Sequence, residues 1–193
     1  RSIIKNQIHA EKSEAMPNKK SLNRMQSRIQ FLNAQETEIK SDIAQIINNN
    51  PELKETIKRI TTIPGVGALT ATIVLAETNG FELIRSKSQL TSYAGLDVKE
   101  KQSGTSVKGK PRISKKGNRN LRKAMYLPAL TAVKWDDNFK AIYARLVSKH
   151  GIKMKALVAI QRKLLELIYI LFKNETIYDN EYSIKNSVQI QMI

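Results

Sequence analysis

The sequence predicts a mainly α-helical protein in which a coiled-coil arm precedes a compact helical domain. Two observations carry this prediction: a heptad repeat of apolar residues within the first 50 residues, and a 3.6-residue apolar periodicity in the last third of the chain. A glycine-rich basic segment interrupts the helices between them. The length of 193 residues suffices for one hydrophobic core and an extension.

The arm is predicted over residues 1–50, with a break at Pro17 and Asn18 after a short first helix. Its apolar positions are then spaced alternately by three and four residues, with one polar exception. An ordinary amphipathic helix on a globular core is the alternative, but the other positions are almost wholly polar and leave only the narrow seam of a coiled coil. The repeat does not decide whether this seam pairs with the first helix or with another chain. The repeat comprises Leu22, Met25, Ile29, Leu32, Glu36, Ile39, Ile43 and Ile46.

The helical domain is predicted over residues 51–175, and residues 176–193 are expected to form a peripheral tail. Pro51 suits the first turn of a helix, and Gly95 and Gly151 each follow the end of one. Between these markers, apolar periodicity and capping residues define the elements. The predicted helices span residues 51–61, 68–77, 86–94, 119–133, 137–150 and 154–171.

Composition excludes several classes of function. The chain has no cysteine, which excludes disulfides and thiolate metal sites, and its two histidines are too far apart in sequence to suggest a zinc site. We expect no membrane span and no signal peptide, and hence an intracellular, cytoplasmic protein. The chain starts at Arg1 within helix-like sequence, so we expect a longer protein upstream.

Two features of the last predicted helices have simple structural interpretations. Asp136 and Asp137 stand at a helix start, where capping is the expected role rather than metal binding. Tyr126 and Trp135 are interpreted as core residues, and a base-stacking role has no support in the sequence.

Positive charge is concentrated in one segment. Residues 99–123 contain ten basic residues and a single acid, a net +9 out of the chain's formal +16. A merely solvated basic surface is the alternative, but such a surface mixes both signs. The segment is therefore predicted to contact nucleic acid.

The segment from Ile63 to Ala71 predicts a helix-hairpin-helix. Gly65 and Gly67 flank an apolar residue at the turn, and glycine permits positive φ and close approach of a ligand. Backbone amides at the start of the second helix could hold a phosphate without reading sequence. A tight turn without a ligand is an equally good interpretation, because the turn carries no Lys or Arg.

Residues 102–122 place hydroxyls among cations and glycines. The glycines exclude one long helix, and residues 106–107 and 112–114 are predicted as short strands around a turn at 108–111. A serine here could attack phosphorus, with cations stabilising the transition state. The residues alone favour hydroxyls that only hydrogen-bond phosphates, because the nearest carboxylates that could act as a base are Asp97 and Glu100.

Five segments in a fixed order are similar to a known family. They are residues 63–67, 93–97, 102–104, 113–118 and 121–122, which read Ile-Pro-Gly-Val-Gly, Tyr-Ala-Gly-Leu-Asp, Gln-Ser-Gly, Ile-Ser-Lys-Lys-Gly-Asn and Leu-Arg. Together they resemble the C-terminal domain of the IS-one-ten family of insertion-sequence transposases, to which the Piv DNA invertases are related. The resemblance covers about residues 60–172.

The resemblance implies that this chain acts only together with a further domain and with several partners. Family members carry an upstream RuvC-like nuclease domain with acidic ligands for Mg²⁺, which is absent from this chain; no cofactor is expected in the chain itself. The resemblance implies three partners: DNA, a bridge RNA and further copies of the protein. These copies are expected to form a dimer or tetramer through the coiled coil. Alone, the chain is expected to bind nucleic acid without recombining it.

The resemblance also assigns roles to residues. It implies that Ser103 is the nucleophile that forms a covalent phosphoserine link to DNA, with Ser106 and Ser114 ranked below it. A non-catalytic helix-hairpin-helix module that binds DNA or RNA is the main alternative, and an assembly element built on the coiled coil is a third. The candidate nucleic-acid contacts are Gly65, Gly67, Thr105, Ser106, Lys108, Lys110, Arg112, Ser114, Lys115, Lys116, Asn118, Arg119 and Arg122.

Overall fold

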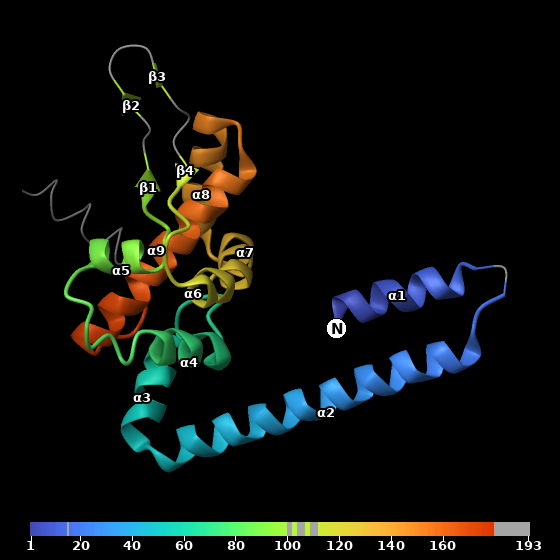
Figure 1. The fold of residues 1–193 in the computed structure, drawn as a ribbon. Helices are drawn as coiled ribbons and strands as arrows, with labels where there is room; N and C mark the ends of the chain where they lie inside the picture. Colours follow the sequence, from blue (N-terminus) through green and yellow to red (C-terminus); the bar gives the residue numbers. More distant parts are fainter. Residues whose placement is uncertain (15, 100–101, 104–106, 109–111, 180–193) are drawn as a thin grey trace, which may run out of the picture. The chain divides into compact units, whose positions relative to one another are not determined.

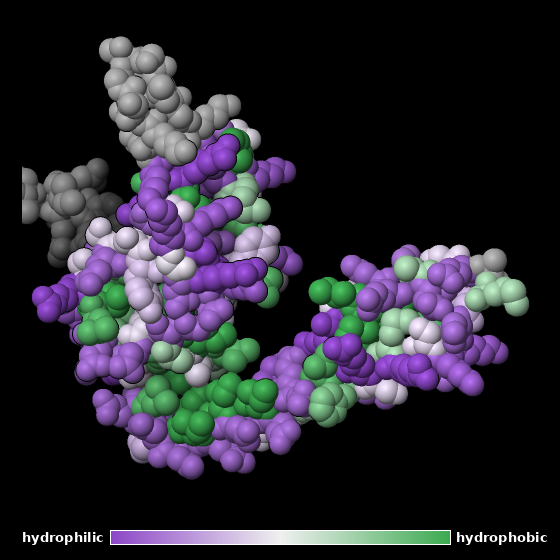
Figure 2. All heavy atoms as spheres, viewed as in Figure 1, coloured by the Kyte–Doolittle hydropathy of each residue, from purple (hydrophilic) through white to green (hydrophobic). Residues whose placement is uncertain are grey.

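The chain is mostly helical, as the sequence predicts (Figure 1). The computed structural model describes residues 1–14, 16–99, 102–103, 107–108 and 112–179, with the backbone alone at 102–103 and 107–108. It divides into two compact units, unit 1 (Arg1–Lys54) and unit 2 (Glu55–Ile193), and each is described by itself. Hydrophilic side chains cover most of the visible surface of both (Figure 2).

Unit 1 is a helical hairpin. Helix α1 (Ser2–Lys12) packs against α2 (Lys19–Asn49), so the first helix covers part of the apolar seam of the second. Asn18 starts α2: its side chain accepts hydrogen bonds from the amides of Lys20 and Ser21, both at 3.1 Å. The predicted helices are confirmed here, and the coiled coil beyond the hairpin stays a prediction.

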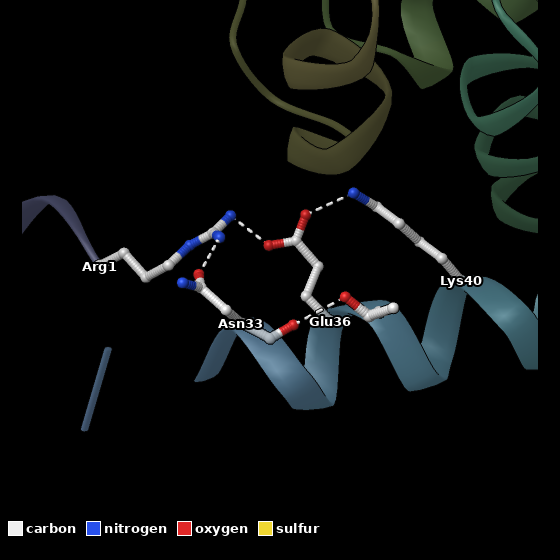
Figure 3. Close-up of polar contacts among 5 residues, drawn as sticks. Arg1, Asn33, Glu36 and Lys40 are labelled. Atoms are coloured by element: carbon white, nitrogen blue, oxygen red, sulfur yellow. Dashed lines mark hydrogen bonds and ion pairs between the residues drawn. The ribbon is translucent and has the colours of Figure 1, made fainter. Parts of the chain in front are cut away.

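Glu36, the polar exception in the heptad, is the centre of an ion-pair cluster (Figure 3). Its carboxylate pairs with the Arg1 guanidinium and with Lys40 Nζ, the latter at 2.6 Å, and Arg1 also donates to Asn33 Oδ1 at 2.6 Å. The hydrogen bond from Lys40 and the charge of Arg1 lower the pKa of Glu36. The seam is thus interrupted by a carboxylate that neighbouring cations hold in its charged form.

Unit 2 is built around its last helix, α9, which packs against α5, α7 and α8. Side chains from α9 and from the preceding helices fill the core, including Ile160, Leu164 and Ile168 of α9 with Leu90 and Leu121. These positions follow the apolar periodicity that predicts the helix. Unit 2 begins within α3 (Pro51–Ile60), and its other helices are α4 (Ala68–Glu77), α5 (Lys87–Tyr93), α6 (Arg119–Ala124), α7 (Tyr126–Trp135), α8 (Asp137–His150) and α9 (Lys153–Asn174).

The predicted helix over 119–133 is wrong in one respect, because it breaks at Met125 into α6 and α7. Pro128 explains the break. It has no amide hydrogen to donate to the carbonyl four residues earlier, and its ring crowds that carbonyl. The buried Met125 side chain anchors the corner in the core.

The interpretation of Tyr126 and Trp135 as core residues is also wrong. The Trp135 side chain is 72% exposed and the Tyr126 side chain 39%. Trp135 is the last residue of α7, and its ring lies 4.9 Å from the ammonium of Lys134 rather than in the core. The prediction placed both rings in the core because they are apolar, but aromatic side chains also lie on protein surfaces.

The turn between α3 and α4 is held against α7. Gly65 has φ +88°, and a Cβ atom there would lie 2.7 Å from the carbonyl oxygen of Pro128 and 3.0 Å from the amide nitrogen of Ala132. Gly67 is different: it is the N-cap of α4, with φ −87°, and a Cβ would meet nothing within 4 Å. Close packing therefore requires the first glycine but not the second.

The basic segment of residues 99–123, called the insertion from here on, forms two antiparallel pairs of short strands together with Val98. Strand β1 (Val98–Lys99) pairs with β4 (Arg112–Ile113), and β2 (Gln102–Ser103) with β3 (Val107–Lys108). Because Lys108 lies in a strand, the predicted turn starting there is wrong, and residues 106 and 109–111 of that prediction lie outside the described residues.

Tyr178, shortly after α9, connects two parts of unit 2. Its amide donates to Thr62 Oγ1 at 2.9 Å and its hydroxyl to Asp136 Oδ2 at 2.8 Å. Asp136 is buried, and its other oxygen accepts from the amide of Phe139 at 2.9 Å, which confirms its predicted capping role. Burial, together with the Asp136 carboxylate, raises the pKa of Tyr178 to about 12.

Candidate nucleic-acid interface

Three backbone hydrogen bonds join the second half of the insertion to the end of α5 and the residues that follow it. The amides of Ser114, Lys115 and Asn118 donate to the carbonyls of Asp97, Gly95 and Tyr93, at 2.8, 3.1 and 2.8 Å. Gly117, with φ +153°, allows this approach, because a Cβ there would lie 2.4 Å from the Tyr93 carbonyl oxygen. The segment after β4 is thus laid directly on the end of α5.

Like charges face each other at the start of the insertion. Lys99 in β1 is the register partner of Arg112 in β4, and both side chains are exposed. Opposite positions of an antiparallel pair lie on one face of the sheet, and two cations there destabilise the pairing. Neither forms an ion pair with a described residue. Such an arrangement is stabilised when an anion binds between the two cations.

Three more exposed cations follow β4. Lys115, Lys116 and Arg119 lie in the loop after β4 and at the start of α6, and none is ion-paired within the described part of the chain. An open cleft of about 500 Å³ lies beside Lys116. Its lining includes Lys116, Gly117 and Asn118, with Ser92 and Tyr93 from α5. Lys116 therefore borders a shallow open hollow between α5 and the start of α6.

Two predicted contact residues are engaged in holding the fold. Arg122 Nη1 donates to the carbonyls of Ala94, Gly117 and Asn118, at 2.7, 3.2 and 3.3 Å. Asn118 is the N-cap of α6, and its Oδ1 accepts from the amides of Asn120 and Leu121. The Nη1 group of Arg122 and the side-chain amide of Asn118 therefore help to hold the insertion in place.

Glu77, at the end of α4, is a supporting residue that the sequence did not reveal. Its two carboxylate oxygens accept from the side-chain amides of Asn118 at 2.6 Å and Asn120 at 2.7 Å, and its carbonyl accepts from the Tyr93 hydroxyl at 3.0 Å. The two amide hydrogen bonds lower the pKa of Glu77. Glu77 thus fixes the start of α6 beside the exposed cations. Nothing in the sequence signals a pairing over 41 residues.

The candidate nucleophiles occupy different settings. Ser103 lies in β2, with Val107 of β3 as its register partner. Ser114 Oγ donates to Asp97 Oδ1 at 2.5 Å, so the carboxylate that sequence reasoning offered as a base is bound to this serine. Ser106, Thr105 and Lys110 lie outside the described residues.

No group of three or more His, Cys, Asp or Glu side chains in the described residues is arranged to hold a metal ion. None of the described helices is long and apolar enough to cross a membrane. What unit 2 does present is exposed, unpaired positive charge on a rigid helical base, which suits the phosphate backbone of a nucleic acid.

Comparison with known proteins agrees with this geometry. A model of the transposase IS116/IS110/IS902 family matches residues 57–144, from α3 through the insertion into α8. Residues 57–144 belong to this transposase family. The resemblance to the IS-one-ten family seen in the sequence is thereby confirmed.

Individual relatives extend over more of the chain. The "Pilin gene-inverting protein" of Moraxella bovis is 31% identical over 144 residues, which cover 74% of this chain and 45% of the relative. The insertion element IS110 uncharacterized 43.6 kDa protein of Streptomyces coelicolor is 30% identical over 121 residues, or 63% of this chain and 30% of the relative. The chain thus spans less than half the length of these curated relatives.

Proposed function

We propose that this chain is the C-terminal part of a DNA transposase or recombinase, and that it supplies Ser103 as the nucleophile that cuts and rejoins DNA strands. The observation that carries the proposal is the insertion itself. Its serine lies in β2, and the adjoining β1–β4 pair carries two facing cations in a chain of the transposase family. Those cations supply the charge that a phosphodiester needs in order to approach.

The proposed reaction is a transesterification. The Ser103 oxygen attacks phosphorus, a Ser–O–P bond forms, and the P–O bond to the leaving deoxyribose breaks. The serine proton goes to a base, and the leaving sugar oxygen gains a proton. Neither water nor an oxidant is consumed, so the reverse attack by another sugar hydroxyl joins the strands.

Other parts are needed to complete this reaction. We include in the proposal a RuvC-like nuclease domain whose Mg²⁺ stabilises charge on the phosphate, and a bridge RNA that selects the DNA sites. The resemblance of the five sequence segments supports both. Lys99, Arg112, Lys115, Lys116 and Arg119 are the proposed backbone contacts of the described residues.

The test of Ser103 is capture of a covalent protein–DNA adduct. The chain is reconstituted with the nuclease domain and RNA, DNA is added, and denaturing electrophoresis followed by mass spectrometry locates the modified residue. Wild type should form an adduct on Ser103, and Ser103→Ala should form none. Ser106→Ala and Ser114→Ala are the matched controls and should keep the adduct.

Two results would contradict this assignment. An adduct that persists in Ser103→Ala and disappears in Ser114→Ala would move the nucleophile to the serine that Asp97 binds. DNA binding by wild type with no adduct at all would favour a non-catalytic binding module.

The proposal also includes assembly through α2. Beyond Glu36 the heptad positions Ile39 and Ile46 are 58% and 62% exposed, and Arg1, at the start of α1, already reaches Glu36. We expect these isoleucines to pair with another copy. Ile39→Glu with Ile46→Glu should reduce the mass measured by light scattering, whereas Ser41→Glu with Gln45→Glu should not. An unchanged mass in the isoleucine variant would exclude the pairing.

A further inference from the structure

The net charge of the chain resides in two segments, and the insertion is only one of them. Residues 99–123 carry a net +9, and residues 138–165 carry seven basic residues and no acid. Together they equal the whole formal charge of +16, so the rest of the chain is balanced. The second segment forms α8, the turn at Gly151 and the first half of α9.

The cations of this second segment are all on the surface. Six of the seven have no ion-pair partner in the described part of the chain, and only Arg162 is paired, with Glu166 at 2.8 Å. The basic residues are Lys140, Arg145, Lys149, Lys153, Lys155, Arg162 and Lys163.

The charges crowd toward the α8–α9 turn. Arg145 and Lys149 are four residues apart on α8, where like charges destabilise a helix, and Lys153 and Lys155 begin α9 directly after the turn. A basic surface that serves solubility alone would interleave acids at these spacings. The repulsion is relieved when the surface binds a polyanion.

We propose that the tip of the α8–α9 hairpin is a second nucleic-acid contact, which grips the phosphate backbone through Arg145, Lys149, Lys153 and Lys155. This inference rests on the proposed function, since it takes the partner to be DNA or RNA. The surface is separate in sequence from the insertion, so one domain would hold a nucleic acid at two places. The contact is to phosphates and carries no sequence preference.

Two exposed apolar side chains lie within the same tip. Ile152 is 47% exposed and precedes Lys153, and Met154 is 55% exposed and lies between Lys153 and Lys155. Proteins that grip duplexes also place apolar side chains against sugars and base edges in the minor groove. An anionic lipid surface would suit the same mixture, and the experiment below separates the two.

The test compares two triple variants of the 193-residue chain. Arg145→Gln, Lys149→Gln and Lys153→Gln remove charge from the tip. Lys58→Gln, Arg85→Gln and Lys87→Gln remove the same charge from exposed sites outside both basic segments. Gln matches Lys and Arg in helix propensity, so both variants should fold, which circular dichroism checks.

Affinity for a fluorescent 20-base-pair DNA duplex and for the same RNA duplex is measured against salt concentration. Each lost phosphate contact lowers the slope of log affinity against log salt by about 0.9. The tip variant should therefore lose between two and three units of slope on the duplex that uses this surface, and the control less than one. A loss of slope on the DNA duplex only, on the RNA duplex only, or on both supports the proposal and identifies the nucleic acid that binds the tip.

Two outcomes would overturn the inference. One is equal slopes for the tip variant and the control on both duplexes. The other is unchanged duplex binding together with lost binding to phosphatidylserine vesicles, which would assign the tip to a membrane. Neither depends on Ser103, because the adduct test can fail while this surface still binds.

Discussion

The α3–α4 turn and the α8–α9 turn both join two helices in unit 2, and both contain glycine, yet their surroundings differ. Gly65 is pressed against the backbone of α7 and its turn carries no cation. Gly151 has open space around it and lies among lysines. Glycine spacing describes how a turn is built, whereas exposure and charge decide whether it can hold a phosphate.

The largest expected effect tests the packing of the first turn. Gly65→Ala forces a side chain into a positive φ and against the Pro128 carbonyl, so we expect it to lower the free energy of unfolding by roughly 2–4 kcal/mol. Gly67→Ala should cost less than about 1 kcal/mol, since its backbone conformation and space suit alanine. Urea denaturation measures both, and equal losses would show that the turn is not held by α7.

A second effect concerns the support of the insertion at acidic pH. Hydrogen bonds from Asn118 and Asn120 lower the pKa of Glu77 in the folded state, so its contribution to stability is present above the ordinary Glu pKa, about 4.3, and is lost as pH falls through the lowered value. Wild type should therefore lose more stability between pH 6 and pH 3 than Glu77→Gln does. Glu55→Gln, an exposed control, should follow wild type. Parallel curves for wild type and Glu77→Gln would contradict the role of Glu77.

A third effect appears in alkali, and it concerns a contact between the first turn and the start of α8. Tyr178 binds Thr62 beside the first turn and Asp136 at the start of α8. Its pKa is raised to about 12, so the phenol stabilises the fold below its ordinary pKa of about 10 and this contribution is lost as pH rises toward 12. Thermal unfolding of Tyr178→Phe should depend less on pH across this interval than that of wild type. An identical dependence would mean that the hydroxyl is not held by Asp136.

The smallest expected effect is on binding at the first turn. Gly67→Glu places a carboxylate at the start of α4, where nothing lies within 4 Å of the added Cβ. If the turn holds a phosphate, the new charge should weaken duplex binding strongly. We expect less than a twofold change in affinity by fluorescence anisotropy, and a tenfold loss would support the helix-hairpin-helix as a binding site.

Local signals in the sequence predicted the helices well. Pro51, Asn118 and Asp136 mark helix starts in the structure as they do in the sequence, because capping depends on residues within one turn. The break at Met125 was missed although Pro128 was visible, since the apolar pattern continues through it. Trp135 was misplaced because hydrophobicity does not fix which face of a helix packs.

The sequence predicted the basic residues of the candidate site but not the residues that support them. The exposed Arg112, Lys115 and Lys116 were expected from their density in the sequence. The pairings of Glu77 with Asn118 and of Asp97 with Ser114 join residues that are distant in sequence, and no local pattern encodes them. The register of the strands also depends on tertiary contacts. The sequence alone therefore did not show that Lys108, predicted in a turn, belongs to a strand and pairs with Gln102.

The most direct test of this account is a map of backbone amide shifts in the ¹⁵N spectrum of the chain as duplex DNA or RNA is added. The account predicts that amides around Arg112 and Lys116 and those around Lys149 and Lys153 shift, while those of Gly65 and Gly67 stay in place. Shifts confined to Gly65, Gly67 and the start of α4 would contradict it, because the phosphate would then lie at the one turn of the two that carries no positive charge.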